Sequence, residues 1–116
     1  MHKLKLTAYT GTAAKYIGGS TTSTLFSFNS KNSSKLERRF ENVNTIIVDE
    51  VSMIGCRQLT KISNRLTKAK HANASLAFGG IDVIFFGDFI QFPPIKDAPL
   101  YSGWKNEWII APKMNK

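Results

Sequence analysis

The feature that most constrains this sequence is a short apolar run that stops at two adjacent carboxylates. Residues 45–48 are apolar or β-branched, and Asp49 and Glu50 follow them directly. Such a run is typical of a strand that is buried on both faces of a parallel sheet. Ligands of open parallel sheets bind outside the carboxyl ends of the strands. We therefore expect Asp49 and Glu50 to lie at a functional site.

The two acids suit the chemistry of nucleotide hydrolysis. In P-loop nucleotidases an Asp at the end of a strand helps to hold Mg²⁺. A Glu beside it is well placed to act as the base on the attacking water. This interpretation assigns Asp49 to the metal and Glu50 to the water. A strand followed by an ordinary polar turn has the same short pattern, so this segment alone leaves both interpretations open.

A second segment has the same design. Residues 81–86 are another apolar run, and Asp88 and Gln91 follow before the proline pair at residues 93–94. Proline has no backbone donor, so the pair should mark the edge of the sheet. Gln91 could position a terminal phosphate group, or it could only cap the backbone of its own loop. The two segments predict one cluster at the end of the sheet: Asp49, Glu50, Asp88 and Gln91.

The remaining pattern predicts an α/β fold with a mostly parallel sheet and flanking helices. A strand over residues 3–9 should join the two apolar runs, which gives a small sheet of three strands. At 116 residues the chain forms a single domain at most. The expected helices cover residues 10–17, 35–41 and 55–70, and the expected loops cover residues 20–34 and 72–80.

The charge balance favours a polyanionic partner. Sixteen basic and eight acidic side chains give a net charge of +8. Nucleic acid is the simplest partner for such a surface. The helix predicted over residues 55–70 has a basic face, which could contact nucleic acid or could be an ordinary solvated face. That face consists of Arg57, Lys61, Arg65 and Lys68.

Cysteine and hydropathy patterns favour an intracellular protein. Cys56 is the only cysteine, so no internal disulfide and no cysteine metal cluster can form, as is usual in a reducing compartment. No apolar run approaches membrane-spanning length, and the first residues are too quickly polar for a signal peptide. We expect an intracellular location, the nucleus or the mitochondrion in a eukaryote, and no membrane partner.

Three segments together resemble one family, the PIF-type (petite integration frequency) ATP-dependent DNA helicases, which are related to the RecD helicases. The likeness runs from the first predicted strand to Trp104. The segments are Thr7-Ala-Tyr-Thr-Gly-Thr-Ala-Ala14 with Ile17-Gly-Gly-Ser-Thr21, then Ile46-Ile-Val-Asp-Glu-Val-Ser-Met53, and finally Phe78-Gly-Gly-Ile81 with Gly87-Asp-Phe-Ile-Gln-Phe-Pro-Pro94.

The resemblance implies a role for each matching position. Asp49 would help to coordinate Mg²⁺ on ATP, Glu50 would activate the hydrolytic water, and Gln91 would couple the γ-phosphate to movement of the DNA-binding parts. Hydroxyls and backbone amides at a helix start suit contact with the backbone of single-stranded DNA. The positions that match the DNA-contacting segments are Thr7, Thr10, Gly11 and Thr21.

The sequence departs from the family pattern at a few positions. Tyr9 stands where the family usually has Pro, Ser23 stands where it usually has His, and Phe92 replaces a Leu. The change at Ser23 puts one DNA contact in doubt. The Gly-rich phosphate loop ending in Gly-Lys-Ser/Thr does not occur in these residues, nor does the second motor domain.

The resemblance therefore implies that residues 1–116 are one partial RecA-like domain. By the same resemblance it would belong to a 5′-to-3′ DNA helicase that couples ATP hydrolysis to translocation on single-stranded DNA in repair, recombination and telomere maintenance. We expect this piece alone to be inactive. Two alternatives stay open: a basic nucleic-acid-binding remnant without catalysis, whether of a helicase or of a mobile element, and a different P-loop ATPase.

Overall fold

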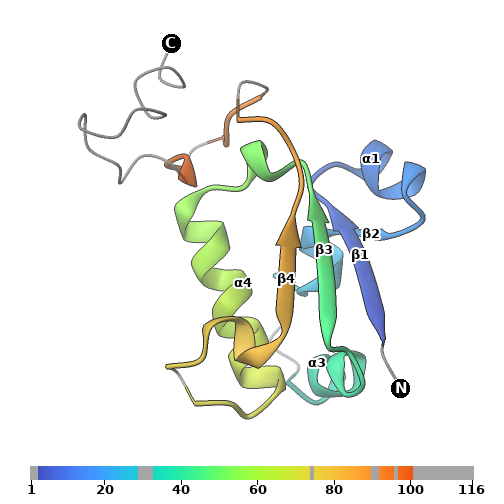
Figure 1. Ribbon diagram of the computed structural model, residues 1–116, viewed down its shortest axis with the longest axis vertical. Helices are drawn as coiled ribbons and strands as arrows, with labels where there is room; N and C mark the ends of the chain where they lie inside the picture. The colour runs from blue at the N-terminus through green and yellow to red at the C-terminus, as the bar shows by residue number, and fades with distance from the viewer. Residues whose placement is uncertain (1–2, 29–32, 74, 90–91, 96, 101–116) are drawn as a thin grey trace.

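A sheet of parallel strands forms the centre of the molecule. The computed structural model describes residues 3–28, 33–73, 75–89, 92–95 and 97–100. The sheet has four strands in the order β2-β1-β3-β4, and every neighbouring pair is parallel. The arrowheads of β1, β3 and β4 lie at the same edge of the sheet (Figure 1). The strands are β1 (Leu4–Ala8), β2 (Ser20–Thr21), β3 (Thr45–Asp49) and β4 (Asp82–Phe85).

The helices follow the sequence pattern closely at three places. The helices expected over residues 10–17, 35–41 and 55–70 are confirmed with small shifts at their ends, and Gly18 ends the first one in a left-handed conformation with φ of 74°. Short 3-10 turns follow β3 and precede β4. The helices are α1 (Gly11–Tyr16), α2 (Thr22–Leu25), α3 (Ser33–Phe40) and α4 (Cys56–Ala69), and the 3-10 turns are η1 (Val51–Met53) and η2 (Ala77–Gly80).

Both predicted loops contain regular structure, which corrects the prediction. The segment expected as a loop over residues 20–34 holds β2 and α2, and the segment over residues 72–80 holds η2. The hydroxyl of Thr7 donates a hydrogen bond of 2.7 Å to the carbonyl of Ser20, which attaches β2 to β1. Thr21 then caps α2 by accepting a hydrogen bond from the backbone N–H of Thr24. The sheet therefore has four strands where three were expected.

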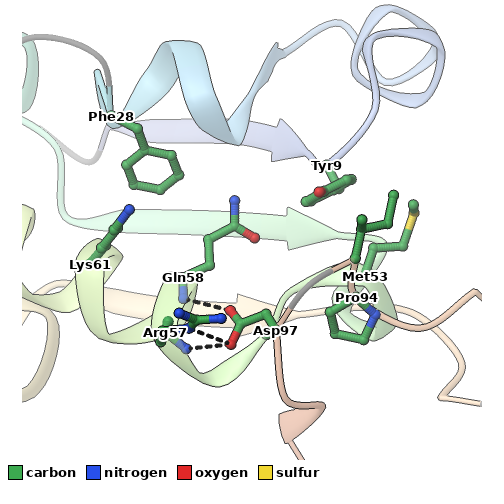
Figure 2. Close-up of a pocket in the computed structure, with 10 residues that line it drawn as sticks. Tyr9, Phe28, Met53, Arg57, Gln58, Lys61, Pro94 and Asp97 are labelled. Carbon is green, nitrogen blue, oxygen red and sulfur yellow. Dashed lines mark hydrogen bonds and ion pairs between the residues drawn. The ribbon is translucent and has the colours of Figure 1, made fainter.

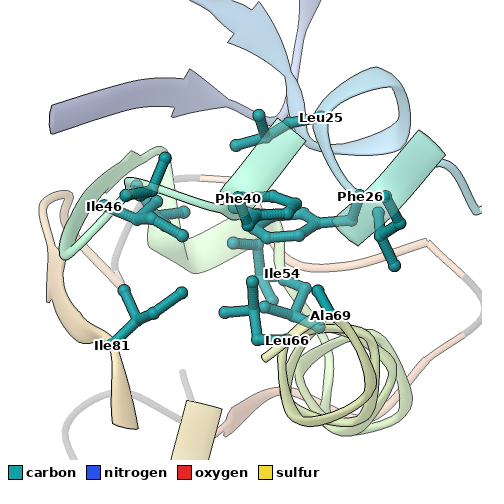
Figure 3. Close-up of a cluster of buried hydrophobic side chains, with 12 residues drawn as sticks. Leu25, Phe26, Phe40, Ile46, Ile54, Leu66, Ala69 and Ile81 are labelled. Atoms are coloured by element: carbon teal, nitrogen blue, oxygen red, sulfur yellow. The ribbon is translucent and has the colours of Figure 1, made fainter. Parts of the chain in front are cut away.

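The core lies between the sheet and helices α2, α3 and α4. Ile46 and Val48 of β3 point toward Ile62 and Leu66 of α4, and all four are fully buried. The rings of Phe26 and Phe40 stack 5.9 Å apart in the same cluster (Figure 3). Side chains at alternate positions of β3 and at spacings of three and four on α4 thus meet on one face of the sheet.

The opposite face of the sheet is only half covered. Leu6 and Ile47 are half-buried, whereas Ile84 and Phe86 are 46% and 53% exposed. These residues alternate along their strands with the core residues, and the register pairs Leu6 with Ile47 and Ile47 with Ile84. The expectation that β3 is buried on both faces is therefore wrong for the described residues, because α2, α3 and α4 all pack on the same side.

Candidate active site

Asp49 and Glu50 lie at the carboxyl end of the central strand β3. Asp49 is the last residue of the strand, and Glu50 has a left-handed backbone with φ of 61° and ψ of 44°. That conformation costs a non-glycine residue about 1 kcal/mol. Two hydrogen bonds hold it: the Glu50 N–H donates to Asp49 Oδ1 at 2.8 Å, and the Val51 N–H donates to the Phe86 carbonyl at 2.9 Å. The chain therefore turns sharply here and directs Glu50 away from the line of β3.

The Glu50 side chain reaches the start of α1. Its Oε1 accepts a hydrogen bond of 2.8 Å from the backbone N–H of Thr10. The Thr10 hydroxyl lies 3.0 Å from both carboxylate oxygens of Glu50 and donates to this carboxylate. The same hydroxyl accepts from the Ala13 N–H at 3.3 Å and so caps α1. The predicted hydrolytic residue is thus bonded to a predicted DNA-contacting residue 40 positions earlier.

Neighbouring strands bring the predicted site residues to the same edge of the sheet. The register pairs Thr21 of β2 with Ala8 of β1, and Ala8 with Asp49 of β3. Thr10 and Gly11 follow β1 at this edge, and no described residue outside its own helix and chain neighbours lies within 4 Å of the position that a Gly11 Cβ would take. The described structure therefore leaves room for a side chain at Gly11.

The predicted DNA-contacting hydroxyls have different surroundings. The Thr7 side chain is fully buried and bonded to Ser20, so it holds β2 in place and its hydroxyl is not available to DNA. The Thr21 hydroxyl is exposed, caps α2 and donates to Thr24 Oγ1 at 3.0 Å. The burial of Thr7 thus contradicts a direct hydroxyl contact, whereas the DNA contacts of Thr10, Gly11 and Thr21 stay predictions.

The third predicted site residue, Gln91, lies outside the described residues. Asp88 is exposed just beyond β4, on the strand that pairs with β3. Gly87 precedes it with φ of 139°, and a Cβ there would lie 2.8 Å from the backbone N of Val51. The ends of β3 and β4 are therefore in close backbone contact, while the clustering of Gln91 with Asp49 and Glu50 stays a prediction.

The strand-end carboxylates fit a magnesium–nucleotide site. Among the described residues no group of three or more His, Cys, Asp or Glu side chains could hold a metal by itself. Mg²⁺ is commonly bound through one or two carboxylates together with substrate phosphates and waters. Asp49 uses one oxygen for the Glu50 N–H. Its other oxygen is the donor that would contact such an ion.

Sequence reasoning missed the role of Asp97. Its carboxylate accepts hydrogen bonds from the backbone N–H groups of Arg57 at 3.2 Å and Gln58 at 3.1 Å. Asp97 therefore caps α4 from about 40 residues away, because Gly55 at the helix start has no side chain to do so. Desolvation raises the pKa of Asp97, but the backbone hydrogen bonds from Arg57, Gln58 and Ala98 outweigh it and hold the pKa below its ordinary value. A Cβ at position 55 would collide with Asp97. The glycine before α4 was therefore the one feature of the sequence that could have indicated a cap from elsewhere in the chain.

The basic face of α4 is confirmed as a helix face, and part of it turns toward other residues. The Arg57 guanidinium pairs with Asp97 at 3.4 Å, and Lys61 Nζ lies 6.0 Å from the centroid of the Phe28 ring. Arg65 donates to the Phe28 carbonyl at 3.4 Å, and Lys68 is exposed. Arg57, Lys61 and Lys68 are nevertheless exposed, so a solvated face and a nucleic-acid contact both stay open. In the described part of the chain, no helix is long and apolar enough to span a membrane.

Comparison with protein families gives one clear match. The model of the PIF1-like helicase family matches residues 4–106. The chain is 35% identical over 106 residues to the ATP-dependent DNA helicase PIF1 of Saccharomyces cerevisiae (strain YJM789), which covers 81% of this chain and 12% of that protein. It is 30% identical over 105 residues to the ATP-dependent DNA helicase Pif1 of Bdellovibrio bacteriovorus, which covers 80% of this chain and 24% of that protein.

Solved structures give the same match. The fold is similar to that of a Bacteroides Pif1 helicase in complex with ADP-AlF3 and ssDNA, with a TM-score of 0.73, 29% identity, and coverage of 82% of this chain and 24% of that one. It is also similar to the Pif1 helicase of Candida albicans, with a TM-score of 0.67, 27% identity, and coverage of 87% and 26%. The chain therefore spans between 12% and 26% of the length of these four proteins.

Proposed function

The chain belongs to the PIF1-like helicase family, and from this premise we propose that it is the part of an ATP-dependent DNA helicase in which nucleotide hydrolysis and DNA contact meet. The whole activity, coupling of ATP hydrolysis to movement along single-stranded DNA, is proposed for the longer protein in which these residues act. The four-stranded parallel sheet supports this proposal, because it matches the RecA-like domain of the solved Pif1 helicases.

The observation that carries the proposal is the contact between Glu50 and Thr10. The N–H and the hydroxyl of Thr10 are both bonded to the Glu50 carboxylate. Hydrolysis requires a carboxylate that is free to accept a proton from water. Contact with a DNA phosphate requires the donors of Thr10. Because the same hydrogen-bonding groups serve both purposes, DNA that engages Thr10 would release Glu50 for hydrolysis.

The nucleotide part of the proposal assigns roles to the strand-end residues. Asp49 would hold the Mg²⁺ of ATP, and Glu50 would orient and deprotonate the attacking water. Gln91, assigned on sequence alone, would report the γ-phosphate to the DNA-binding parts. Bound Mg²⁺ neutralises charge that develops on the phosphate oxygens. The position of both acids at the carboxyl end of a central parallel strand supports these roles.

The DNA part of the proposal places the sugar–phosphate backbone over the start of α1 and the end of β2. Thr10, Gly11 and Thr21 lie together at the carboxyl edge of the sheet and offer hydroxyls and an open backbone. The net charge of +8 attracts the phosphates. Binding through phosphates should be independent of base sequence and should weaken steeply as salt rises.

A charge insertion tests the DNA contact. We propose to measure binding of a fluorescent oligo(dT) by anisotropy at low and at raised salt, with Gly11→Glu as the test variant. The side chain has room, and an acid in the first turn of a helix is favourable to the fold. The matched control is Asn42→Glu, which makes the same charge change at an exposed residue just before β3, at the opposite end of the sheet.

The expected result is that Gly11→Glu weakens binding by about tenfold, whereas Asn42→Glu has a small effect, because repulsion acts over a short range in salt. Equal weakening by both variants would mean that only net charge matters, and the assigned contact would be wrong. Absence of binding by the unchanged chain at low salt would contradict the DNA part of the proposal altogether.

We further propose that the longer protein moves in the 5′-to-3′ direction and serves DNA repair, recombination and telomere maintenance. These roles rest on the family resemblance alone. We also propose an intracellular location, the nucleus or the mitochondrion in a eukaryote, which the single cysteine Cys56 supports through its fit to a reducing compartment.

A further inference from the structure

A pocket of about 290 Å³ lies beside the end of β1, and its described lining includes neither Asp49 nor Glu50. It is bounded by the end of β1, the residues after α2 and the first turns of α4, and its lining includes Tyr9, Phe28, Gln58 and Lys61. Figure 2 shows the Phe28 and Tyr9 rings at opposite sides, with the Gln58 amide between them. The volume is at the low end for small-molecule sites, so it suits one flat group rather than a chain of them.

The lining has the chemistry that a nucleobase requires. Aromatic side chains offer surfaces on which a base can stack whatever its identity. The amide of Gln58 can both donate and accept, as the edge of a base does. Lys61 Nζ lies 6.0 Å from the centroid of the Phe28 ring, so the pocket also has a positive charge that would attract a phosphate.

The carboxylate of Asp97, which also lines the pocket, does not prevent a base from binding there. The Asp97 carboxylate is already engaged by the Arg57 guanidinium and by the backbone N–H groups of Arg57, Gln58 and Ala98. Its charge is therefore balanced locally. Lys61 remains as the cation of the pocket that faces an aromatic ring.

The pocket adjoins the proposed DNA contact through Tyr9, which lines it. Tyr9 directly precedes Thr10, whose backbone N–H and hydroxyl are bonded to Glu50 and are the donors that the proposed phosphate contact would use. A strand that engaged Thr10 and Gly11 would therefore pass beside the residue that carries the Tyr9 ring. Tyr9 is also one of the positions where the sequence departs from the family pattern, which has Pro there, so the ring is a feature of this chain.

We propose that this pocket holds one base of the bound single strand, stacked against Tyr9 and closed on the far side by Phe28, with Lys61 near its phosphate. The proposal rests on the proposed function, because it takes the ligand to be single-stranded DNA. In this proposal the base contributes to the affinity for single-stranded DNA, in addition to the contacts with the sugar–phosphate backbone. Stacking is tolerant of sequence, so the base is recognised by its flat surface rather than by its identity.

The experiment compares two oligonucleotides of equal length and charge, oligo(dT) and the same backbone with abasic sites. Fluorescence anisotropy gives the affinity of the 116-residue chain for each. The test variant is Tyr9→Leu, which keeps the apolar contact that Tyr9 makes with the core but removes the aromatic ring. Tyr9→Phe keeps the ring, and Tyr16→Ala removes a tyrosine that is 93% exposed on α1.

The unchanged chain should bind oligo(dT) about tenfold more tightly than the abasic strand, a preference in the range of one stacked base. Tyr9→Leu should lose this preference without changing the affinity for the abasic strand, while Tyr9→Phe and Tyr16→Ala should keep it. Equal affinity of the unchanged chain for both strands, or a preference that survives Tyr9→Leu, would overturn the proposal. Either result leaves the proposed function standing, because that function fails only if neither strand is bound.

Discussion

The backbone N–H of Thr10 and the Oε1 of Glu50 are 2.8 Å apart, and the Thr10 hydroxyl bonds the same carboxylate. This pairing joins the start of α1 to the end of β3. It occupies the donors that the proposed DNA contact needs, and it also occupies the carboxylate that hydrolysis needs. The two proposed sites would therefore compete directly for the same hydrogen-bonding groups.

The first prediction concerns that competition. Glu50→Gln should tighten oligo(dT) binding several-fold more than Asp49→Asn. Both variants remove one negative charge from neighbouring residues, but only the first weakens the bonds that hold the Thr10 donors. Anisotropy titrations at one salt concentration make the comparison. If the two variants tighten binding equally, the effect is general electrostatics and the competition between Glu50 and DNA is ruled out.

The second prediction concerns hydrolysis. The 116-residue polypeptide alone should release no phosphate from ATP above background, with or without single-stranded DNA. The sequence contains no Gly-Lys-Ser/Thr loop to surround the phosphates, and such donors supply most of the charge stabilisation in phosphoryl transfer. A phosphate-release assay tests this. DNA-stimulated release that Glu50→Gln abolishes would instead reveal a phosphate site within these residues.

The third prediction concerns a buried hydroxyl. Thr22 is fully buried at the start of α2, and its Oγ1 has no hydrogen-bond partner among the residues that the structure describes. Thr22→Val replaces the hydroxyl by a methyl group of similar size and should raise the free energy of unfolding by about 1 kcal/mol. Thr22→Ser keeps the hydroxyl but loses the methyl group, so it should lower the free energy of unfolding. Urea titrations monitored by circular dichroism measure both, and a stabilising Ser variant would contradict the argument.

The fourth prediction concerns two glycines that flank α1. A Cβ at Gly19 would collide with the Leu6 carbonyl, so Gly19→Ala should lower the free energy of unfolding by about 1–3 kcal/mol. Gly11→Ala has open space at the start of the helix and should raise it by about 0.5 kcal/mol. Thermal unfolding of the two variants gives the comparison. Equal effects would show that Gly19 does not approach β1 as closely as described.

The fifth prediction concerns pH. Desolvation raises the pKa of the Asp97 carboxyl, but the hydrogen bonds from Arg57, Gln58 and Ala98 outweigh it and hold this pKa below its ordinary value in the folded chain. A depressed carboxyl pKa stabilises the fold above the unfolded value of about 3.9, and this contribution disappears as pH falls through the folded value. Asp97→Asn should therefore flatten the loss of thermal stability below about pH 4. Parallel pH profiles of the two proteins would show that Asp97 does not contribute.

Much of the site could be predicted because its signals are local. The apolar run before Asp49 and Glu50 is a continuous pattern, and it placed both acids at the end of a central strand. The two-residue strand β2 has no pattern of its own, since it exists through its pairing with β1, where Thr7 lies opposite Ser20 and Ala8 opposite Thr21. The burial of Thr7 follows from that same pairing, so a threonine that looks like a phosphate ligand in the sequence is part of the core.

The contacts that could not be predicted join distant residues. Asp97 caps α4 across about 40 positions, and Glu50 bonds Thr10 across the same separation. Nothing in the spacing of the sequence distinguishes these partners from other acids. Tyr9 and Phe28 also line the same pocket only because β1 and α2 both end beside α4. Such relationships depend on topology, which the local patterns do not specify.

The close approach of Gly87 to Val51 has a consequence for how the site can be driven. The peptide after Glu50 is bonded to the Phe86 carbonyl and lies against Gly87, so backbone touches backbone where β3 and β4 end. A displacement of the segment after β4 would reach Glu50 mechanically, through main-chain atoms alone. Such a linkage would not depend on a side chain of its own. Its steric demand falls on position 87, where a Cβ would lie 2.8 Å from the backbone N of Val51.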